Sequence, residues 1–545
     1  MYGQRIGVIH EVSGARVGDQ VWRVRRKYDH TRAQRTKIIA AIAIITLLVS
    51  FLHSLIGNAQ QESSHRVRFL GNDEVALDTR FRLITSAQSE ILAEYFSVWD
   101  DQPSIDFLGL LLEAAKRGVK VKIIVDAMAT KIPAALMTAL RQQGQGPSGQ
   151  SQLELKYYSA FLPYNPFRAN HREHAKMLIV DGTKMILGGR NIGDKYFGFN
   201  RDHPGQENRD YIDVDTLIAG PAVSIARSNF YQVWASPMAS EPSLGNLSPN
   251  SIAEDACLNS AGRRDRSKCE QDRKSAIQLI EKQTQRVAAN LPLALQRMDK
   301  YRDERNKELA KVSSEIDFVT LDQDPFGVSE IIEDVKFLSH DPSKKVTSES
   351  AWMTKDLLRL LEQALPDSTV EIVTPYLVPT AEFERVFTDL IRKKVRVVVY
   401  TNSLFSTDHL ISVAAYRSVR EKLVKLGLEI HEFKGPETLH AKIFKLKTNQ
   451  GDVAVVCTFN LNQRSANLDR EVGLQITVQD PSSSLFFGDL SAKISEFRAN
   501  SEMVSSDGQF VPGFDLKKWD DRLSTGAKLG SRILSIFLPF IFGST

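Results

Sequence analysis

Two stretches of the chain carry the same residue pattern and decide its organisation. The first reads NHREHAKMLIVDGTKMILGGRNIGDKYF over residues 170–197, and the second reads LHAKIFKLKTNQGDVAVVCTFNLNQRSANLDREVG over residues 439–473. Each contains a histidine, a lysine two residues later, two apolar runs around a turn signal, and an asparagine after the second run. Residues i and i+2 of a strand share a face, so each histidine should point the same way as its lysine. The repeat therefore predicts two similar hairpins.

The turn of the first hairpin predicts its register. Asp181-Gly182 is a strong turn signal between two apolar strands. A turn centred between Gly182 and Thr183 would set Asn191 opposite His174. The first hairpin is then expected to bring an imidazole, an ammonium and a carboxamide to one edge.

The second hairpin can be tested in the same way. Pairing His440 with Asn460 centres the turn at Gln450, within TNQGD, and sets Thr458 opposite Lys442. The same three functional groups should therefore gather in each half of the chain. The second turn is expected to be three residues longer than the first.

The flanking regions repeat as well. Residues 85–125 show a strand, an apolar-periodic helix and a strand, and residues 355–402 show the same order. Such duplication predicts two similar α/β lobes. Between them, residues 237–335 begin rich in Ser, Pro and Asn and continue into a highly charged helical pattern, which indicates a connector or insertion.

Composition excludes several classes of protein. The chain has 545 residues, of which 25% are charged and 42% hydrophobic, so neither intrinsic disorder nor a polytopic membrane protein fits it. The net charge is +4, but residues 1–37 alone carry +6, so no nucleic-acid-binding surface is expected on the remainder. Three cysteines exclude a disulfide framework, although Cys257 and Cys269 could form one bridge and leave Cys457 unpaired.

The N-terminal region contains a candidate membrane span. Residues 38–56 lack formal charges, and a helix of this length would rise about 28 Å, close to the hydrocarbon thickness of a bilayer. Lys and Arg are concentrated before it, which predicts a cytoplasmic N-terminus and an outward-facing bulk. A buried core helix and a signal peptide cleaved near residues 57–59 are the alternatives. Near the other end, residues 533–542 could pack on the protein or dip into the membrane interface.

With these motifs in place, the chain resembles the phospholipase D superfamily, whose duplicated pattern is H-x-K-x4-D-x6-G-[SG]-x-N. Within that superfamily it is similar to bacterial cardiolipin synthases. The likeness includes RGVKV, VTPYLVP and TNSLFSTD as well as the two motifs. It implies an α/β fold of two phospholipase D-type lobes, each a mixed sheet flanked by helices, behind an N-terminal transmembrane helix. The expected segments are a basic cytoplasmic arm (1–37), a transmembrane anchor (38–56), lobe 1 (62–236), a charged connector (237–335), lobe 2 (336–525) and an apolar tail (526–545).

The resemblance also implies roles for individual residues. One histidine would attack a phosphodiester to form a phosphohistidine while the other protonates the leaving group, with His174 assigned as nucleophile and His440 as acid. The lysines and asparagines would hold the phosphate oxygens, and further residues would orient or support them. The expected catalytic residues are His174, Lys176, Asn191, His440, Lys442 and Asn460, and the expected supporting residues are Asp181, Asp213, Thr458 and Glu471.

No cofactor or metal is expected. An ammonium two residues from each histidine would repel a metal cation, and the chain has no H-x-x-x-H motif or cysteine cluster.

The second motif departs from the family pattern in two places. Lys447 stands where the pattern has its aspartate, and Cys457 stands where it has glycine. The missing carboxylate could mean a catalytic defect. Since Asp181 sits at the turn of the first hairpin, a structural role for this position is the preferred interpretation.

The expected activity is phosphatidyl transfer of the cardiolipin synthase type onto a glycerophospholipid alcohol. The expected substrates are phospholipids such as phosphatidylglycerol. The protein is expected in the bacterial inner membrane, with the bulk of the chain on the periplasmic side. A hydrolytic phospholipase D is the main alternative. A nuclease or other phosphodiesterase, and a non-catalytic membrane scaffold, remain further alternatives.

Overall fold

The computed structural model describes residues 64–132, 151–159, 170–200, 209–241, 324–347 and 349–505, with isolated positions within 140–144 and 274–289. The basic arm, the candidate span at residues 38–56, most of the expected connector and the apolar tail lie outside these residues. So do Cys257 and Cys269, whereas Cys457 is a buried free thiol. No helix among the described residues is both long and apolar enough to cross a membrane.

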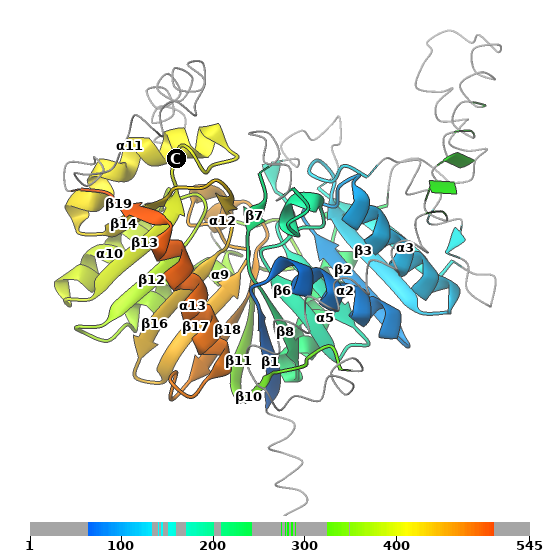
Figure 1. The fold of residues 1–545 in the computed structure, drawn as a ribbon, viewed down its shortest axis with the longest axis horizontal. Coiled ribbons are helices and arrows are strands. Elements are labelled where there is room, and N and C mark those ends of the chain that lie inside the picture. Colours follow the sequence, from blue (N-terminus) through cyan, green and yellow to red (C-terminus); the bar gives the residue numbers. More distant parts are fainter. Residues whose placement is uncertain are drawn as a thin grey trace, which may run out of the picture. The chain divides into compact units, whose positions relative to one another are not determined.

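The first lobe is built on a mixed sheet in which nine strands are described (Figure 1). Their order is β10-β1-β8-β6-β5-β2-β3-β4-β9. Strands β2, β3 and β4 run parallel, and the other neighbours are antiparallel. The strands are β1 (His65–Leu70), β2 (Glu90–Tyr95), β3 (Lys120–Asp126), β4 (Leu153–Tyr158), β5 (Lys176–Val180), β6 (Lys184–Gly188), β8 (Asp215–Ala219), β9 (Ala239–Ser240) and β10 (Glu330–Ile332).

The second lobe repeats this sheet strand by strand. Its order is β11-β18-β17-β16-β12-β13-β14-β19, which matches the first sheet from β1 to β9. The predicted duplication and the mixed α/β class are therefore confirmed. The strands are β11 (Asp334–Ser339), β12 (Thr369–Val373), β13 (Arg396–Asn402), β14 (Glu429–Phe433), β16 (Ile443–Thr448), β17 (Gly451–Cys457), β18 (Val472–Val478) and β19 (Ser501–Met503).

Helices form layers on both faces of each sheet. The predicted strand-helix-strand units are present as β2-α3-β3 and β12-α10-β13. Some helices begin where a capping side chain satisfies a free backbone N–H group, as Asn72 does for α2 and Asp101 for α3. The longer helices are α2 (Asp73–Ser86), α3 (Gln102–Lys116), α5 (Pro221–Ala235), α9 (Trp352–Glu362), α10 (Ala381–Arg392), α11 (Leu410–Leu426) and α13 (Leu485–Ala499), and the short ones are η2 (Asp194–Tyr196) and α12 (Gln463–Asn467).

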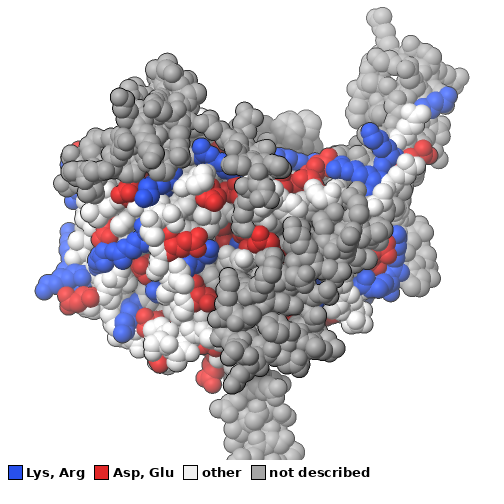
Figure 2. Space-filling view, in the orientation of Figure 1, with Lys and Arg blue, Asp and Glu red and all other residues white. Residues whose placement is uncertain are grey.

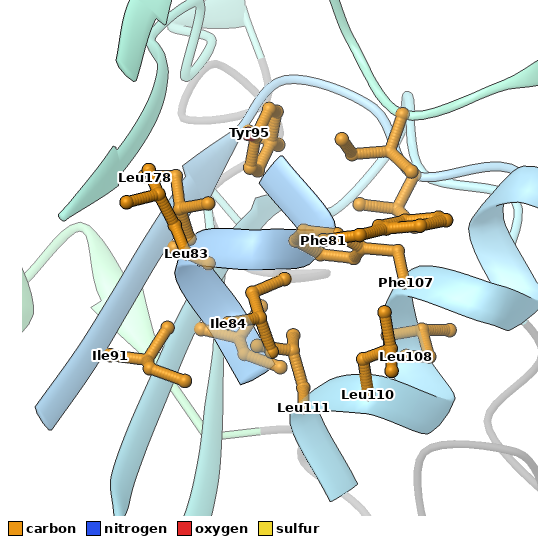
Figure 3. Packing of buried hydrophobic residues seen from close by; sticks show 14 of the residues in the cluster. Phe81, Leu83, Ile84, Ile91, Tyr95, Phe107, Leu108, Leu110, Leu111 and Leu178 are labelled. Atoms are coloured by element: carbon orange, nitrogen blue, oxygen red, sulfur yellow. The ribbon is translucent and has the colours of Figure 1, made fainter. Parts of the chain in front are cut away.

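Three apolar cores hold these layers together. In the outer core of lobe 1, side chains of α2 and α3 such as Phe81 and Phe107 pack on Tyr95 of the sheet (Figure 3). A corresponding outer core lies under α9 and α10 in lobe 2. The central core draws on both lobes, since α5 contacts β11 and α13 contacts β1. The lobes therefore share a buried interior, and the two repeated hairpins both contribute to it.

The first hairpin pairs one residue away from the predicted register. Met177 lies opposite Leu187 and Val180 opposite Lys184, which leaves a three-residue turn. Asp181 and Gly182 both have positive φ, at 52° and 64°. These left-handed conformations centre the turn on Gly182, half a residue before the predicted centre, so the pairing shifts by one residue and the predicted pairing of Asn191 with His174 is wrong.

The second hairpin differs from its prediction in a related way. Thr448 lies opposite Gly451, so the loop has two residues and the turn is shorter than the first, not longer. The additional residues lengthen the strands instead. The N–H of Cys457, rather than that of Thr458, lies against Lys442, donating to its carbonyl at 3.2 Å. Gly451 ends this turn at φ 123°, a conformation that favours glycine. An added side-chain carbon would also meet the Val478 carbonyl oxygen of the neighbouring strand at 2.3 Å.

Positive and negative side chains are interspersed among the coloured residues of the face shown in Figure 2. Exposed charges of opposite sign also form pairs, such as Lys422 with Glu384 and Lys425 with Glu421. Mixed charge of this kind is the usual solvated surface of a globular protein.

Asp181 acts as a structural anchor in the turn. Its carboxylate accepts hydrogen bonds from the backbone N–H groups of Gln88, Ser89 and Glu90, at 2.7–3.1 Å, where β2 begins. Burial alone would raise the pKa of Asp181, but these N–H donors lower it. In the second hairpin the corresponding residue, Lys447, lies in the strand before the turn, exposed and opposite Asp452.

We expect Asp181→Asn to lower the free energy of unfolding by about 1–2 kcal/mol, because charge-assisted hydrogen bonds to the N–H groups are weakened. The difference from wild type should shrink as pH falls, because the carboxylate contributes only while ionised. Chemical denaturation at pH 7 and at about pH 2.5 measures both effects, because the lowered pKa of Asp181 keeps its carboxylate largely ionised at pH 4.

Lys447→Asp should change turnover little, and a large gain in rate would show that the missing carboxylate acts chemically.

Candidate active site

The two motif histidines lie where strands of opposite lobes meet. The segment before β5 runs beside the Arg470 segment of lobe 2, and the His174 N–H donates to the Arg470 carbonyl at 3.0 Å. In the other half, β15 (Thr438–Leu439) pairs in parallel with β7 (Tyr211–Ile212) of lobe 1. The His440 N–H donates to the Ile212 carbonyl at 2.9 Å. Each histidine is therefore held in place by the backbone of the other lobe.

The carboxylates that contact the histidines are exchanged between lobes. His174 Nδ1 lies 2.9 Å from Glu471 Oε2, and His440 Nδ1 lies 2.6 Å from Asp213 Oδ2. A carboxylate at Nδ1 fixes the ring orientation and the tautomer, and leaves Nε2 for chemistry. The family resemblance implied that these two acids orient or support the site, but it did not predict the crossing between lobes.

Each motif lysine folds back beside its histidine. Lys176 Nζ donates to the His174 carbonyl at 2.7 Å and lies 5.0 Å from the centre of the Phe96 ring. Lys442 Nζ lies 2.7 Å from His440 Nδ1 and 3.9 Å from Asp213 Oδ2. Both lysines are almost completely buried. The site therefore brings together four buried basic groups.

This crowding alters their protonation. Burial and neighbouring Lys442 lower the pKa of Lys176 to about 7. Burial and then Lys176 lower the pKa of His174 well below its ordinary value. The pKa of His440 is lowered less, by burial and Lys442, because Asp213 opposes the shift. An anion between these groups would relieve their mutual repulsion, as expected of a phosphate-binding site.

The two orienting carboxylates are not equivalent. Burial would raise the pKa of Asp213, but Lys442 and His440 lower it below its usual range. For Glu471, burial dominates and raises the pKa well above its ordinary value, although Lys176 opposes the shift. The Thr458 hydroxyl donates to Glu471 Oε2, which places this predicted supporting residue beside the carboxylate.

The asparagines occupy different states. The Asn191 amide already has protein partners, accepting from the Ser97 N–H at 3.1 Å and donating to the Tyr196 hydroxyl at 2.7 Å. Asn460 donates its backbone N–H to Ser465, while its buried Oδ1 lacks a hydrogen-bond partner among the described residues. Of the two motif asparagines, Asn191 has both amide atoms paired, whereas the side-chain oxygen of Asn460 has no partner among the described residues.

Asp181 is the predicted residue that the structure separates from this group. Lys176 begins β5 and Asp181 directly follows the end of that strand, so the two residues lie about 16 Å apart along it.

Aromatic residues that the sequence did not single out surround the histidines. The Phe96 ring packs edge-on against His174, with centroids 5.0 Å apart. Tyr196 and Tyr211 lie beside His440, with centroids 5.4 and 5.1 Å away. Local periodicity gives no signal for these contacts, because the rings reach the site from separate loops and strands.

Comparisons with known proteins identify the repeated unit. The family described as "Cardiolipin synthase, PLD-like domain" matches residues 81–204 and again residues 357–486. Cardiolipin synthase C of Escherichia coli (strain K12) is 26% identical over 430 residues, covering 74% of this chain and 79% of the relative. Cardiolipin synthase A of Pseudomonas aeruginosa (strain PAO1) is 33% identical over 173 residues, covering 32% of this chain and 33% of the relative.

The fold also has a solved counterpart. A phosphatidylserine synthase from Haemophilus influenzae Rd KW20 superposes with a TM-score of 0.53, covering 87% of this chain and 93% of that one at 14% identity. This likeness shows the fold. The family match and the duplicated motif show two phospholipase D-like domains in the chain, which is similar to bacterial cardiolipin synthases.

Proposed function

We propose that the protein is a phosphatidyltransferase of the cardiolipin synthase type. The observation that carries this proposal is the pair of buried His–Lys units, each histidine bonded to a carboxylate from the other lobe. This arrangement supplies a nucleophile, an acid and charge for a phosphate in one site. The similar proteins named cardiolipin synthase support a phospholipid as substrate.

In the first step, His174 Nε2 attacks the phosphorus of a phosphatidyl donor. The P–N bond forms as the P–O bond to the head group breaks, and His440 gives its proton to the leaving oxygen. In the second step, an alcohol attacks phosphorus, His440 accepts its proton, and the P–N bond breaks. A phosphatidylated alcohol is released, and both histidines return to their starting states.

The lysines would carry the electrostatic part of the reaction. Lys176 and Lys442 lie beside the two histidines, where ammonium groups could hold the non-bridging phosphate oxygens. In a buried site such contacts are stronger than in water and stabilise the charge that develops at phosphorus. Asn191 and Asn460 are proposed to assist in the same way.

Transfer requires that the alcohol reaches phosphorus before water does. An acceptor bound beside the phosphohistidine gains effective concentration over water, and a lipid acceptor would remain at the membrane with the donor. We propose phosphatidylglycerol or a similar lipid for this role. We also propose that residues 38–56 anchor the protein, with its bulk on the periplasmic side of a bacterial inner membrane.

Asparagine variants of the two histidines should separate their roles. His174→Asn removes the nucleophile and should lower turnover of every substrate by at least about 10³-fold. His440→Asn should turn over phospholipids as slowly as His174→Asn does. It should still release p-nitrophenol from an activated phosphodiester in a burst, because that leaving group needs no proton. His431 offers a matched control, since it also pairs with a carboxylate, Glu429, at 2.7 Å. Normal phospholipid turnover by either active-site variant would contradict the shared site.

The pH dependence follows from the lowered pKa values. The reaction needs protonated His440 and Lys176. Because the pKa of His440 is lowered from its ordinary value of about 6.5, kcat/KM should already fall as pH rises towards that value, and it should fall further above about pH 7, where Lys176 loses its proton. Asp213 raises the pKa of His440, so Asp213→Asn should shift the alkaline limb to lower pH and reduce kcat. Profiles of kcat/KM from pH 5 to 9 measure this. A shift of the limb to higher pH would refute the assigned pairing.

The product distribution tests the activity itself. Purified full-length protein in phosphatidylglycerol-containing vesicles should form cardiolipin in excess of phosphatidic acid, because the bound alcohol outcompetes water. Lipid extraction and mass spectrometry measure both products. Phosphatidic acid as the sole product, with several acceptor lipids, would leave a hydrolytic phospholipase D.

A further inference from the structure

A carboxylate beside His440 has no part in the chemistry described so far. Asp408 ends the TNSLFSTD segment, and its side chain is exposed. Its Oδ1 accepts a hydrogen bond from the Tyr376 hydroxyl at 2.7 Å, and its Oδ2 accepts one from the Tyr211 hydroxyl at 3.2 Å. Tyr376 belongs to lobe 2 and Tyr211 to lobe 1, so the carboxylate joins the two lobes at the surface.

Tyr211 connects this carboxylate to the active site. While its hydroxyl donates to Asp408, its ring lies 5.1 Å from the His440 ring. Asp408 is therefore separated from His440 by the width of one tyrosine side chain. Its negative charge acts at that distance and raises the pKa of His440, against the larger effect of burial.

The loop that carries Asp408 is tied to β15, the strand that directly precedes His440. The Asn402 side chain donates to the Leu439 carbonyl at 2.7 Å and accepts from the Leu439 N–H at 3.0 Å. The Ser406 hydroxyl donates to Asn402 Oδ1 at 2.9 Å. These buried bonds set the distance between loop and histidine, so Asp408 is preorganised relative to the reacting group.

The carboxylate can accept more hydrogen bonds than it receives. An ionised carboxylate has about four acceptor positions, and the two tyrosine hydroxyls occupy one on each oxygen. Within the described part of the chain, no Lys or Arg forms an ion pair with Asp408. An exposed carboxylate flanked by tyrosines suits a ligand that presents N–H or O–H donors.

The proposed reaction places such a ligand here. The acid must lie next to the oxygen that leaves, so the departing head group occupies the His440 side of the phosphorus. An acceptor alcohol attacks from the same side after the head group has left. Phosphate would then lie among the basic groups, and the attached polar group would extend towards Asp408.

We propose that Asp408, held by Tyr376 and Tyr211, is the head-group subsite and determines which polar groups are exchanged at phosphorus. Its ligand chemistry is a head group bearing hydrogen-bond donors, either hydroxyls or an ammonium. Asp408 touches the head group and not the phosphorus, so it acts on specificity. This inference rests on the phosphatidyltransfer proposed above.

The test compares three donor lipids with full-length protein in mixed micelles. Phosphatidylglycerol offers hydroxyls, phosphatidylethanolamine an ammonium, and phosphatidylmethanol neither. We expect Asp408→Ala to lower kcat/KM for at least one of the first two, relative to phosphatidylmethanol, by roughly 10–100-fold, the usual loss for a hydrogen bond to a charged group. Tyr376→Phe should shift the ratio in the same direction by less.

A further variant identifies the donor. Asp408→Asn keeps an acceptor oxygen but removes the charge, so it should retain part of the selectivity for hydroxyls and lose that for an ammonium. Glu421→Gln on α11 is the matched control, because Glu421 is an exposed carboxylate that pairs with Lys425. Its ratios should equal those of wild type.

The outcomes separate the two proposals. If wild type turns over none of the three lipids, phosphatidyl transfer itself fails. If wild type is active and Asp408→Ala lowers all three rates equally, or changes none, the head-group subsite is refuted while the transfer stands. A fall confined to phosphatidylmethanol would refute it too.

Discussion

The crossed pairing of histidines and carboxylates is the constraint on which the rest of the structure depends. His174 relies on Glu471 of the other lobe, and His440 relies on Asp213. Neither lobe could orient its own imidazole, so the site exists only when the two sheets are packed together. The central apolar core, which α5 and α13 share, supplies that packing. The proposed chemistry therefore depends on the duplicated fold, which supplies both the two histidines and their orienting carboxylates.

Buried charges make this lobe interface specific. Arg470 of lobe 2 pairs with Glu94 and Glu173 of lobe 1, at 2.6 and 2.8 Å, directly before Glu471 in the chain. Burial raises the pKa of Glu94 well above its ordinary value, although Arg470 opposes the shift. A buried ion pair of this kind stabilises little compared with apolar packing, but a misaligned interface would leave its charges unpaired. The cluster therefore fixes where Glu471 meets His174.

The sequence predicted those features that depend on local pattern. Alternating apolar residues and turn dipeptides were sufficient for both hairpins and for the strand-helix-strand units, because each is set by neighbours along the chain. The predicted register of the first hairpin was wrong by one residue. It depends on the number of turn residues with left-handed backbone, here Asp181 and Gly182. Contacts between lobes, such as Tyr211 with His440, leave no local trace and required the structure.

The two half-sites share a backbone plan but differ in electrostatics. Arg470 precedes Glu471, whereas Ile212 precedes the other carboxylate, Asp213. His440 and Lys442 lower the pKa of Asp213 and so favour its ionised form. For Glu471, burial has the largest effect and raises the pKa. An ionised partner favours the imidazolium at His440, and a carboxyl of raised pKa favours neutral imidazole at His174. The proposed nucleophile must be neutral and the proposed acid protonated, so this asymmetry agrees with the roles proposed for the two halves of a nearly symmetric fold.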